Sequence, residues 1–148
     1  MHQMKRASSY VVIAACLVVA AGGTVRQAAG QAASPTLDYQ YFKDTVQAVF
    51  LKKREGHTRC VVCHTINDAP FHLVPLSPGA TTWNEEQSRQ NFQLVQKVAQ
   101  AGFEGSKLVV HPLAEEAGGD PHHGGGQQFA SKNDTDWQTL RAWVMGAK

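Results

Sequence analysis

Cysteine is scarce in this chain of 148 residues, which has only three. A structural zinc site built from cysteines uses two ligand pairs, and a second pair at metal spacing is missing here. No segment carries a convincing strand pattern, so a fold built on a sheet is not predicted. The Walker pattern and the Rossmann fingerprint are absent too, which removes the usual sequence support for a phosphate-binding loop. What remains is a small chain with room for one helical domain.

The start of the chain has the composition of a secretory signal peptide. Lys5 and Arg6 precede an almost continuous apolar run over residues 10–21, and small residues follow over 28–33. This is the order of a charged n-region, an apolar h-region and a cleavage site. The run is also too short to span a membrane comfortably. We therefore predict a signal peptide over residues 1–33 and a periplasmic or otherwise exported protein.

The rest of the chain, residues 34–148, is predicted to form a single mature domain. Residues 13–16 resemble a bacterial lipobox, in which Cys16 would be acylated, but the apolar run before Cys16 is short and continues after it. Membrane association is therefore expected only if Cys16 is lipidated or if the leader stays uncleaved. Otherwise Cys16 is an ordinary apolar residue of the leader.

The formal net charge of +2 belongs largely to the leader. Without Lys5, Arg6 and Arg26 the count of Lys and Arg falls from 14 to 11, against 12 Asp and Glu, which gives a charge near −1. No basic excess is left to indicate a nucleic-acid partner. The basic cluster at residues 52–54 is either a solvated helix end or a docking patch for an acidic partner.

Two of the three cysteines lie in the most informative segment, Cys60-Val61-Val62-Cys63-His64. C-x-x-C-H is the attachment signature of c-type haem. The spacing lets both thiols reach one porphyrin from a single helical turn, and the next imidazole binds the iron as proximal ligand. A lone C-x-x-C also occurs in zinc sites, redox thiol pairs and disulfides, but His64 and the export signal favour haem. We expect one haem c, bound through Cys60 and Cys63, with His64 on the iron.

Hydrophobic spacing predicts an all-α fold for the mature chain. Phe42, Val46 and Phe50 lie on one apolar stripe, and Asp38 is a suitable N-cap. Helices are expected over residues 38–53, 82–102, 104–110 and 134–145, with one helical turn at 60–64. The predicted fold class is a small cytochrome c-like helical domain wrapped around one covalently attached haem.

Local signals also mark the segment between the motif and the second long helix. Three prolines and Gly79 predict that residues 66–81 form a loop over the haem, with Phe71 and Leu73 packed on the porphyrin. A capping box is expected at residues 82–85, where the next helix begins.

The second axial ligand of the iron is harder to assign from the residues. Outside the leader the only methionine is Met145, which lies inside the last predicted helix. Besides His64, the mature chain has five histidines: His57, His72, His111, His122 and His123. His122 and His123 lie in a glycine-rich loop just before the final helix, and glycines allow the backbone to approach a ring closely. The residues alone leave His111, His122 and His123 open.

A longer pattern carries a family resemblance. The chain reads Ser106-Lys107-Leu108, His111-Pro112-Leu113, Gly118-Gly119-Asp120 and His123-Gly124-Gly125-Gly126-Gln127-Gln128-Phe129, then Trp137, Leu140 and Trp143. This order resembles the haem domains called planctomycete-type cytochrome c, which are exported and class I-like. The resemblance spans residues 41–146. It implies that the two terminal helices cross and that His123 is the distal ligand, with His122 and His111 as alternatives.

The expected function is transfer of single electrons by an Fe(III)/Fe(II) haem whose two axial positions are both filled by histidine. An electron carrier of this kind is not an enzyme, and its partners are redox proteins whose identity the sequence does not give. The alternative is a haem enzyme or gas sensor, peroxidase-like, with a labile distal site beside which His123 or His111 acts as an acid or base. A docking module of a larger exported complex is a third hypothesis.

Overall fold

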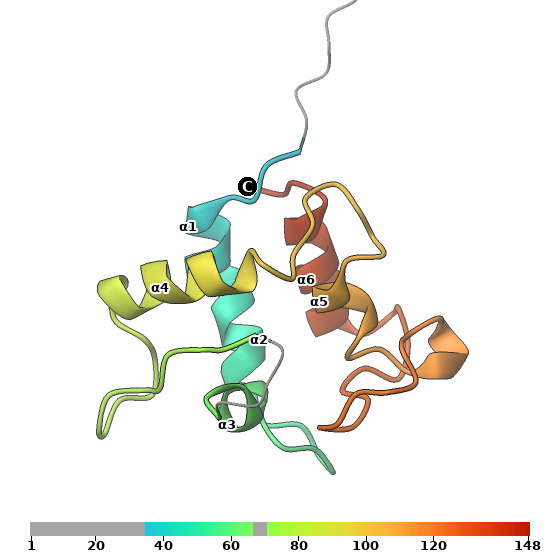
Figure 1. Cartoon of the computed structure of the whole chain (residues 1–148), viewed down its shortest axis with the longest axis horizontal. Coiled ribbons are helices and arrows are strands. Elements are labelled where there is room, and N and C mark those ends of the chain that lie inside the picture. Colours follow the sequence, from blue (N-terminus) through green and yellow to red (C-terminus); the bar gives the residue numbers. More distant parts are fainter. Residues whose placement is uncertain (1–34, 67–70) are drawn as a thin grey trace, which may run out of the picture. The chain divides into compact units, whose positions relative to one another are not determined.

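A computed structural model describes residues 35–66 and 71–148 of the chain. The predicted signal peptide, with Cys16, lies outside the described residues, and so does part of the predicted loop, residues 67–70. The described residues form a small all-α domain with five helices and no β-strand (Figure 1). The helices are a first helix made of α1 (Tyr39–Tyr41), a π-helical segment η1 (Phe42–Val46) and α2 (Gln47–Leu51), then α3 (Cys60–His64), α4 (Glu85–Val95), α5 (Lys107–Val110) and α6 (Thr135–Val144).

The first helix runs without a break through its three segments, close to the predicted range. Asp38 caps it as expected, because its side chain accepts a hydrogen bond from the backbone N–H of Tyr41. The helix ends at Leu51, since Lys52 already has extended backbone angles. The π-helical segment in its middle was not predicted, and π-turns of this kind carry no simple sequence signature.

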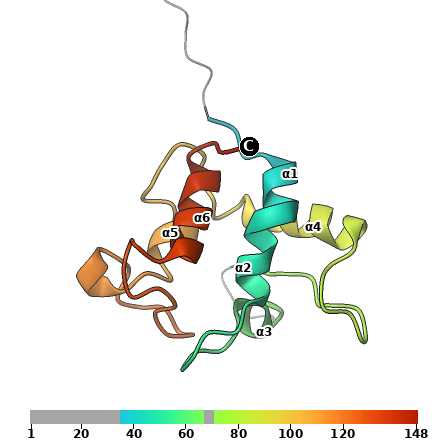
Figure 2. The same cartoon turned by 180° about the vertical axis from the view of Figure 1, so that it is seen from behind.

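The hydrophobic core lies where the first helix meets α4 and α6. Figures 1 and 2 both show the first helix between these two, with α3 at its C-terminal end. The ring of Trp143, from α6, lies 5.2 Å from that of Phe42 and 6.0 Å from that of Phe92, measured between centroids. Trp143 also donates a hydrogen bond from its indole nitrogen to the carbonyl oxygen of Asp38, 2.7 Å away. The first and last helices are thus packed together, as the resemblance implied.

The second long helix, α4, is shorter than predicted, and its N-cap lies two residues later in the chain. Its N-cap is Asn84, which forms a capping box with Gln87 rather than the expected pair at residues 82 and 85. The helix ends at Val95, so the prediction that it reaches residue 102 is wrong. The hydroxyl of Ser106 bonds the Val98 carbonyl and the Gln100 amide, which holds this stretch in an irregular conformation instead.

The chain between α5 and α6 is mostly irregular, as its glycines predicted. A short 3-10 turn, η2 (Glu115–Ala117), is followed by the glycine-rich loop, and Leu113 and Phe129 form an isolated bridge that closes this segment. The last helix agrees with its prediction, because Asp134 caps it and accepts two backbone hydrogen bonds. Within the two described stretches, no helix has the length and hydrophobicity needed to cross a bilayer.

Candidate functional site

A cavity of about 580 Å³ lies between α3 and the chain from α5 to the glycine-rich loop. Its volume falls in the range of about 300–1,000 Å³ found for sites that hold small molecules and cofactors. Much of its wall is apolar, from Phe50, Phe71, Val98, Leu108, Phe129 and Leu140. Arg59 and Lys107 supply the only full charges among the described lining residues, and both are positive. The cavity therefore suits a largely apolar ligand that carries negative charge.

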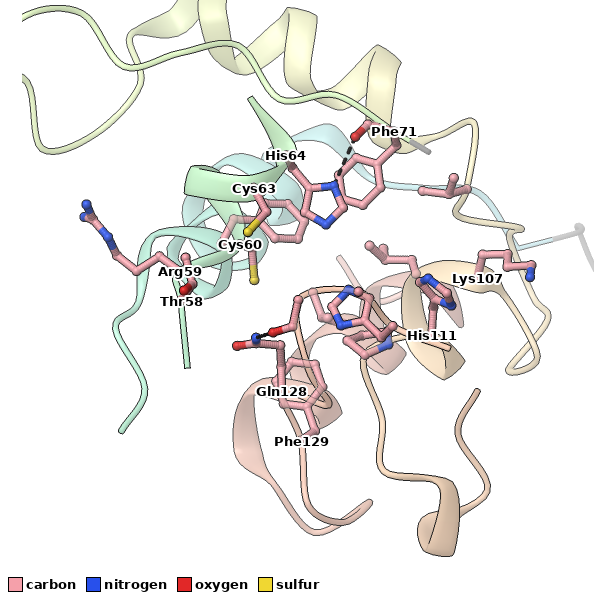
Figure 3. A pocket seen from close by; sticks show the side chains of 18 of the residues that line it. Thr58, Arg59, Cys60, Cys63, His64, Phe71, Lys107, His111, Gln128 and Phe129 are labelled. Carbon is pink, nitrogen blue, oxygen red and sulfur yellow. Dashed lines mark hydrogen bonds between the residues drawn. The ribbon is translucent and has the colours of Figure 1, made fainter. Parts of the chain in front are cut away.

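Helix α3 presents the predicted attachment motif to this cavity. Cys60, Cys63 and His64 lie on a single helical segment, and Figure 3 shows both sulfur atoms and the imidazole facing the cavity. Both cysteines are free thiols and half-buried. Burial raises the pKa of the Cys60 thiol, and the nearby Arg54 guanidinium partly offsets this. The prediction that one helical turn carries all three side chains is confirmed.

The loop after α3 orients His64. Its Nδ1 donates a hydrogen bond to the carbonyl oxygen of Phe71, 3.0 Å away, and the Phe71 ring stacks on the imidazole with a centroid distance of 4.0 Å. With the proton held on Nδ1, the lone pair of Nε2 is left to bind a metal. Burial lowers the pKa of His64, and the nearby His123 and His111 also lower it, which together outweigh the opposing effect of the Phe71 hydrogen bond. The lowered pKa favours the neutral imidazole that a metal requires.

His123 is oriented in the same manner on the other side of the cavity. Its Nδ1 donates to the carbonyl oxygen of Gly126, 2.5 Å away, while the Gly126 amide donates to the His123 carbonyl at 2.9 Å. The loop thus closes on itself in a tight turn to which the imidazole is hydrogen-bonded. Here too the Nδ1 proton leaves Nε2 as the nitrogen with a free lone pair.

The two imidazoles are spaced as a pair of axial ligands would be. Their centroids are 6.4 Å apart and their planes lie 22° from parallel. A metal–imidazole bond measures about 2.0–2.1 Å. A ring centroid lies about 1.1 Å from each ring atom, given C–N bonds of about 1.33 Å. Two imidazoles on opposite sides of one metal therefore place their centroids about 6.3 Å apart. The residues present fit a haem held through His64 and His123.

The other candidate ligands are placed differently. His111 also lines the cavity, and its Nδ1 bonds the Asp120 carboxylate at 2.9 Å, which leaves its Nε2 lone pair free as well. Its ring packs at 80° against that of His123 and has no comparable spacing to His64. His122 is exposed at the cavity rim and donates its backbone N–H to Asp120. Met145 lies at the C-terminal end of α6, outside the cavity lining.

The basic cluster at residues 52–54 has a structural contact. Lys52 and Arg54 both pair with Asp136 of α6, at 2.8 and 2.6 Å. The Arg54 side chain is only 10% exposed, so this pair joins the end of the first helix to α6. The contact favours a structural role for these two side chains, and a docking role stays a prediction.

Three functional features were not identified from the sequence. The carbonyl groups of Phe71 and Gly126 orient the two imidazoles, and backbone groups carry no residue signature. Asp120 belongs to the family pattern, but its contact with His111 was not predicted. The hydrogen bond from His111 is the main reason that the pKa of Asp120 is lowered to about 2. Gln128, which is buried and lines the cavity, supports the loop by donating to the Gly125 carbonyl at 3.1 Å. The sequence hinted at a role for Gln128 only through its position in the run from His123 to Phe129 that carries the family resemblance.

The geometry also bears on the zinc hypothesis. In the part of the chain that the structure describes, no three or more His, Cys, Asp or Glu side chains cluster closely enough to hold a metal ion. A closed zinc site needs four such ligands, whereas iron in a porphyrin needs only two axial ligands from the protein.

No family model, curated protein or solved structure matches this chain. The resemblance to planctomycete-type cytochromes therefore stays a prediction, and the functional hypothesis depends on the residues and their geometry.

Proposed function

We propose that the mature chain is an exported monohaem c-type cytochrome that carries single electrons between redox proteins. Cys60 and Cys63 would hold the haem covalently, His64 would be the proximal ligand and His123 the distal one. The observation that carries the proposal is the spacing of the His64 and His123 imidazoles, whose centroids are 6.4 Å apart and whose planes are nearly parallel. The C-x-x-C thiols lie beside His64 (Figure 3). When bound, haem c would supply a one-electron Fe(III)/Fe(II) couple.

The chain's own residues would keep the two oxidation states similar in structure. Phe71 holds His64 through its carbonyl and its ring, and the Gly126 carbonyl accepts a hydrogen bond from His123, so each imidazole has a partner in the protein. The apolar wall would keep water away from most of a bound haem. A rigid, dry site with both axial positions filled favours electron transfer over binding of oxygen or peroxide.

The charged groups at the cavity support the same assignment. Arg59 and Lys107 line it, and Lys107 also lies 3.6 Å from the Asp120 carboxylate just outside the lining. Two positive side chains at the cavity suit the two propionates of a haem. Val62 and Ile66 are exposed apolar side chains next to Cys63, and Ile66 also lines the cavity. Apolar surface beside a cofactor edge suits transient contact with a redox partner.

The first test is covalent attachment. The full chain is expressed in a host that attaches haem c, and the denatured protein is run on a gel and stained for haem. The wild type and the Cys16→Ser control keep the stain, whereas Cys60→Ser/Cys63→Ser loses it because no thioether can form. A wild-type protein without covalent haem would contradict the proposal.

The second test separates the electron carrier from a haem enzyme or gas sensor. With both axial positions filled, the ferric protein is low-spin and the reduced protein does not change its spectrum under CO. His123→Ala opens the distal position, so this variant binds CO. A wild-type protein that binds CO readily would favour the peroxidase-like alternative, with His111 and Asp120 beside an open site.

A further inference from the structure

A single carboxylate, Asp120, joins α5 to the loop that carries His123. One of its oxygens accepts from His111 Nδ1 at 2.9 Å and lies 3.6 Å from the Lys107 ammonium. The other oxygen accepts the backbone N–H of His122 at 3.1 Å. The amide of Asp120 donates to the Val110 carbonyl at 3.0 Å, which ties it to α5 a second time.

This carboxylate determines where the His111 ring lies. His111 follows α5 directly as its C-cap, and Figure 3 shows it at the cavity near Lys107. With Nδ1 bonded to Asp120, the ring packs almost perpendicular to His123, at 80° and with centroids 4.9 Å apart. The His111 ring therefore supports one side of the His123 imidazole.

Such a support matters because the ring of a histidine turns easily about its last torsion. That torsion joins an sp³ to an sp² carbon and has broad minima, so contacts must define the plane of the ring. The hydrogen bond to Gly126 lies within the same four-residue turn as His123, so it does not tie the ring to another element of the fold. His111 belongs to a different element, which Asp120 fixes. The observed angle between the His123 and His64 planes is 22°.

We propose that His111, held by Asp120, is a positioning residue that sets the plane of the His123 ring nearly parallel to that of His64. This inference rests on the proposed function and adds how the distal ligand is oriented. The relative angle of two imidazole planes on one iron is visible in the ferric EPR spectrum. Near-parallel planes give a rhombic three-line signal, whereas planes near perpendicular give a single feature at large g.

The test compares frozen-solution EPR spectra of the ferric holoprotein in the wild type, Asp120→Asn and His111→Ala. The wild type is expected to give the rhombic signal. Both variants are expected to keep covalent haem and a low-spin iron, but to shift intensity into a large-g feature. Asp120→Asn loses the charge and one of the two acceptor oxygens. Asp120→Glu keeps the charge and both oxygens, so it is expected to restore most of the rhombic signal.

Four results are decisive against the inference. It is overturned if both variants keep the wild-type signal, or if the wild type itself shows the large-g feature. Loss of the low-spin signal in His111→Ala would make His111 a ligand and overturn it as well. So would a shift in Asp120→Asn that Asp120→Glu fails to reverse, because the loop would then be merely loosened. A wild type without haem on the denaturing gel refutes the proposed function instead, so the two failures are distinguishable.

Discussion

Replacing Gly126 by alanine should loosen the distal ligand without blocking it. Gly126 has a φ of +78°, in the left-handed region, and its carbonyl holds His123 Nδ1. A β-carbon at this position would meet its nearest atom, His57 Nδ1, at 3.6 Å, which is an ordinary contact. The cost of the substitution is therefore conformational, about 1–2 kcal/mol for an alanine in this region.

The chain offers a matched control in Gly79. It has the same φ of +78°, and its added β-carbon would meet nothing within 4 Å. Gly79 lies in the turn before α4, away from the residues that line the cavity. Gly79→Ala therefore carries the same backbone strain as Gly126→Ala, and the two variants should lose a similar amount of unfolding free energy in urea.

Only the strain at Gly126 can be relieved by opening the distal loop. If the loop relaxes when His123 leaves the iron, release is favoured by about 1–2 kcal/mol, which is a factor of about 5 to 30. Because an external ligand competes with His123, its apparent affinity rises by the same factor. Titration of the ferric protein with cyanide, followed by absorption, measures this. Gly126→Ala should bind cyanide about 5- to 30-fold more tightly, and Gly79→Ala should match the wild type. Equal affinity in all three proteins would refute the reasoning.

Three further predictions concern stability. Trp143→Phe should lower the free energy of unfolding by about 1–3 kcal/mol, because it removes the buried hydrogen bond to Asp38 and some core volume, and urea denaturation followed by circular dichroism measures this. Arg54→Met should cost about 1.5–3 kcal/mol and Lys52→Met about 0–1 kcal/mol in the same assay, since only the Arg54 end of the Asp136 pair is buried; equal losses would contradict this. The pKa of Asp120 is lowered from 3.8 to about 2, so its stabilising contribution is complete above pH 3.8 and is lost as the pH falls toward 2. The stability advantage of the wild type over Asp120→Asn should therefore shrink between pH 5 and pH 2, and a constant difference would count against it.

The parts of the fold that were predicted correctly depend on neighbouring residues. Asp38 and Asp134 cap the first and last helices, and each bonds amide groups two or three residues ahead. The second helix was predicted too long because its end depends on contacts from elsewhere. Ser106 bonds the chain at Val98 and Gln100, and the Gly102 amide donates to the Val144 carbonyl of α6 at 2.8 Å. No pattern within residues 82–102 contains that information.

In the candidate site, too, the features set by neighbouring residues were predicted and those set by distant contacts were not. Cys60, Cys63 and His64 share one helical segment, so their common orientation followed from spacing alone. The pairing of His64 with His123 depends on how two distant segments fold, and for that reason the residues left three histidines open. The structure places the His64 and His123 rings 6.4 Å apart and nearly parallel, and it bonds the Nδ1 of His111 to Asp120.

Local and distant contacts therefore control different properties of the site. Each imidazole is held by a carbonyl close to it in the chain, Phe71 for His64 and Gly126 for His123, so a change in either turn alters how firmly that ligand binds. The angle between the two ring planes depends instead on His111, which reaches His123 from α5. A change at Gly126 should therefore appear mainly in cyanide affinity, and a change at Asp120 mainly in the EPR line shape. If the two measurements always changed together, the loop and α5 would act as a single unit, and the separate roles assigned to Gly126 and His111 would be wrong.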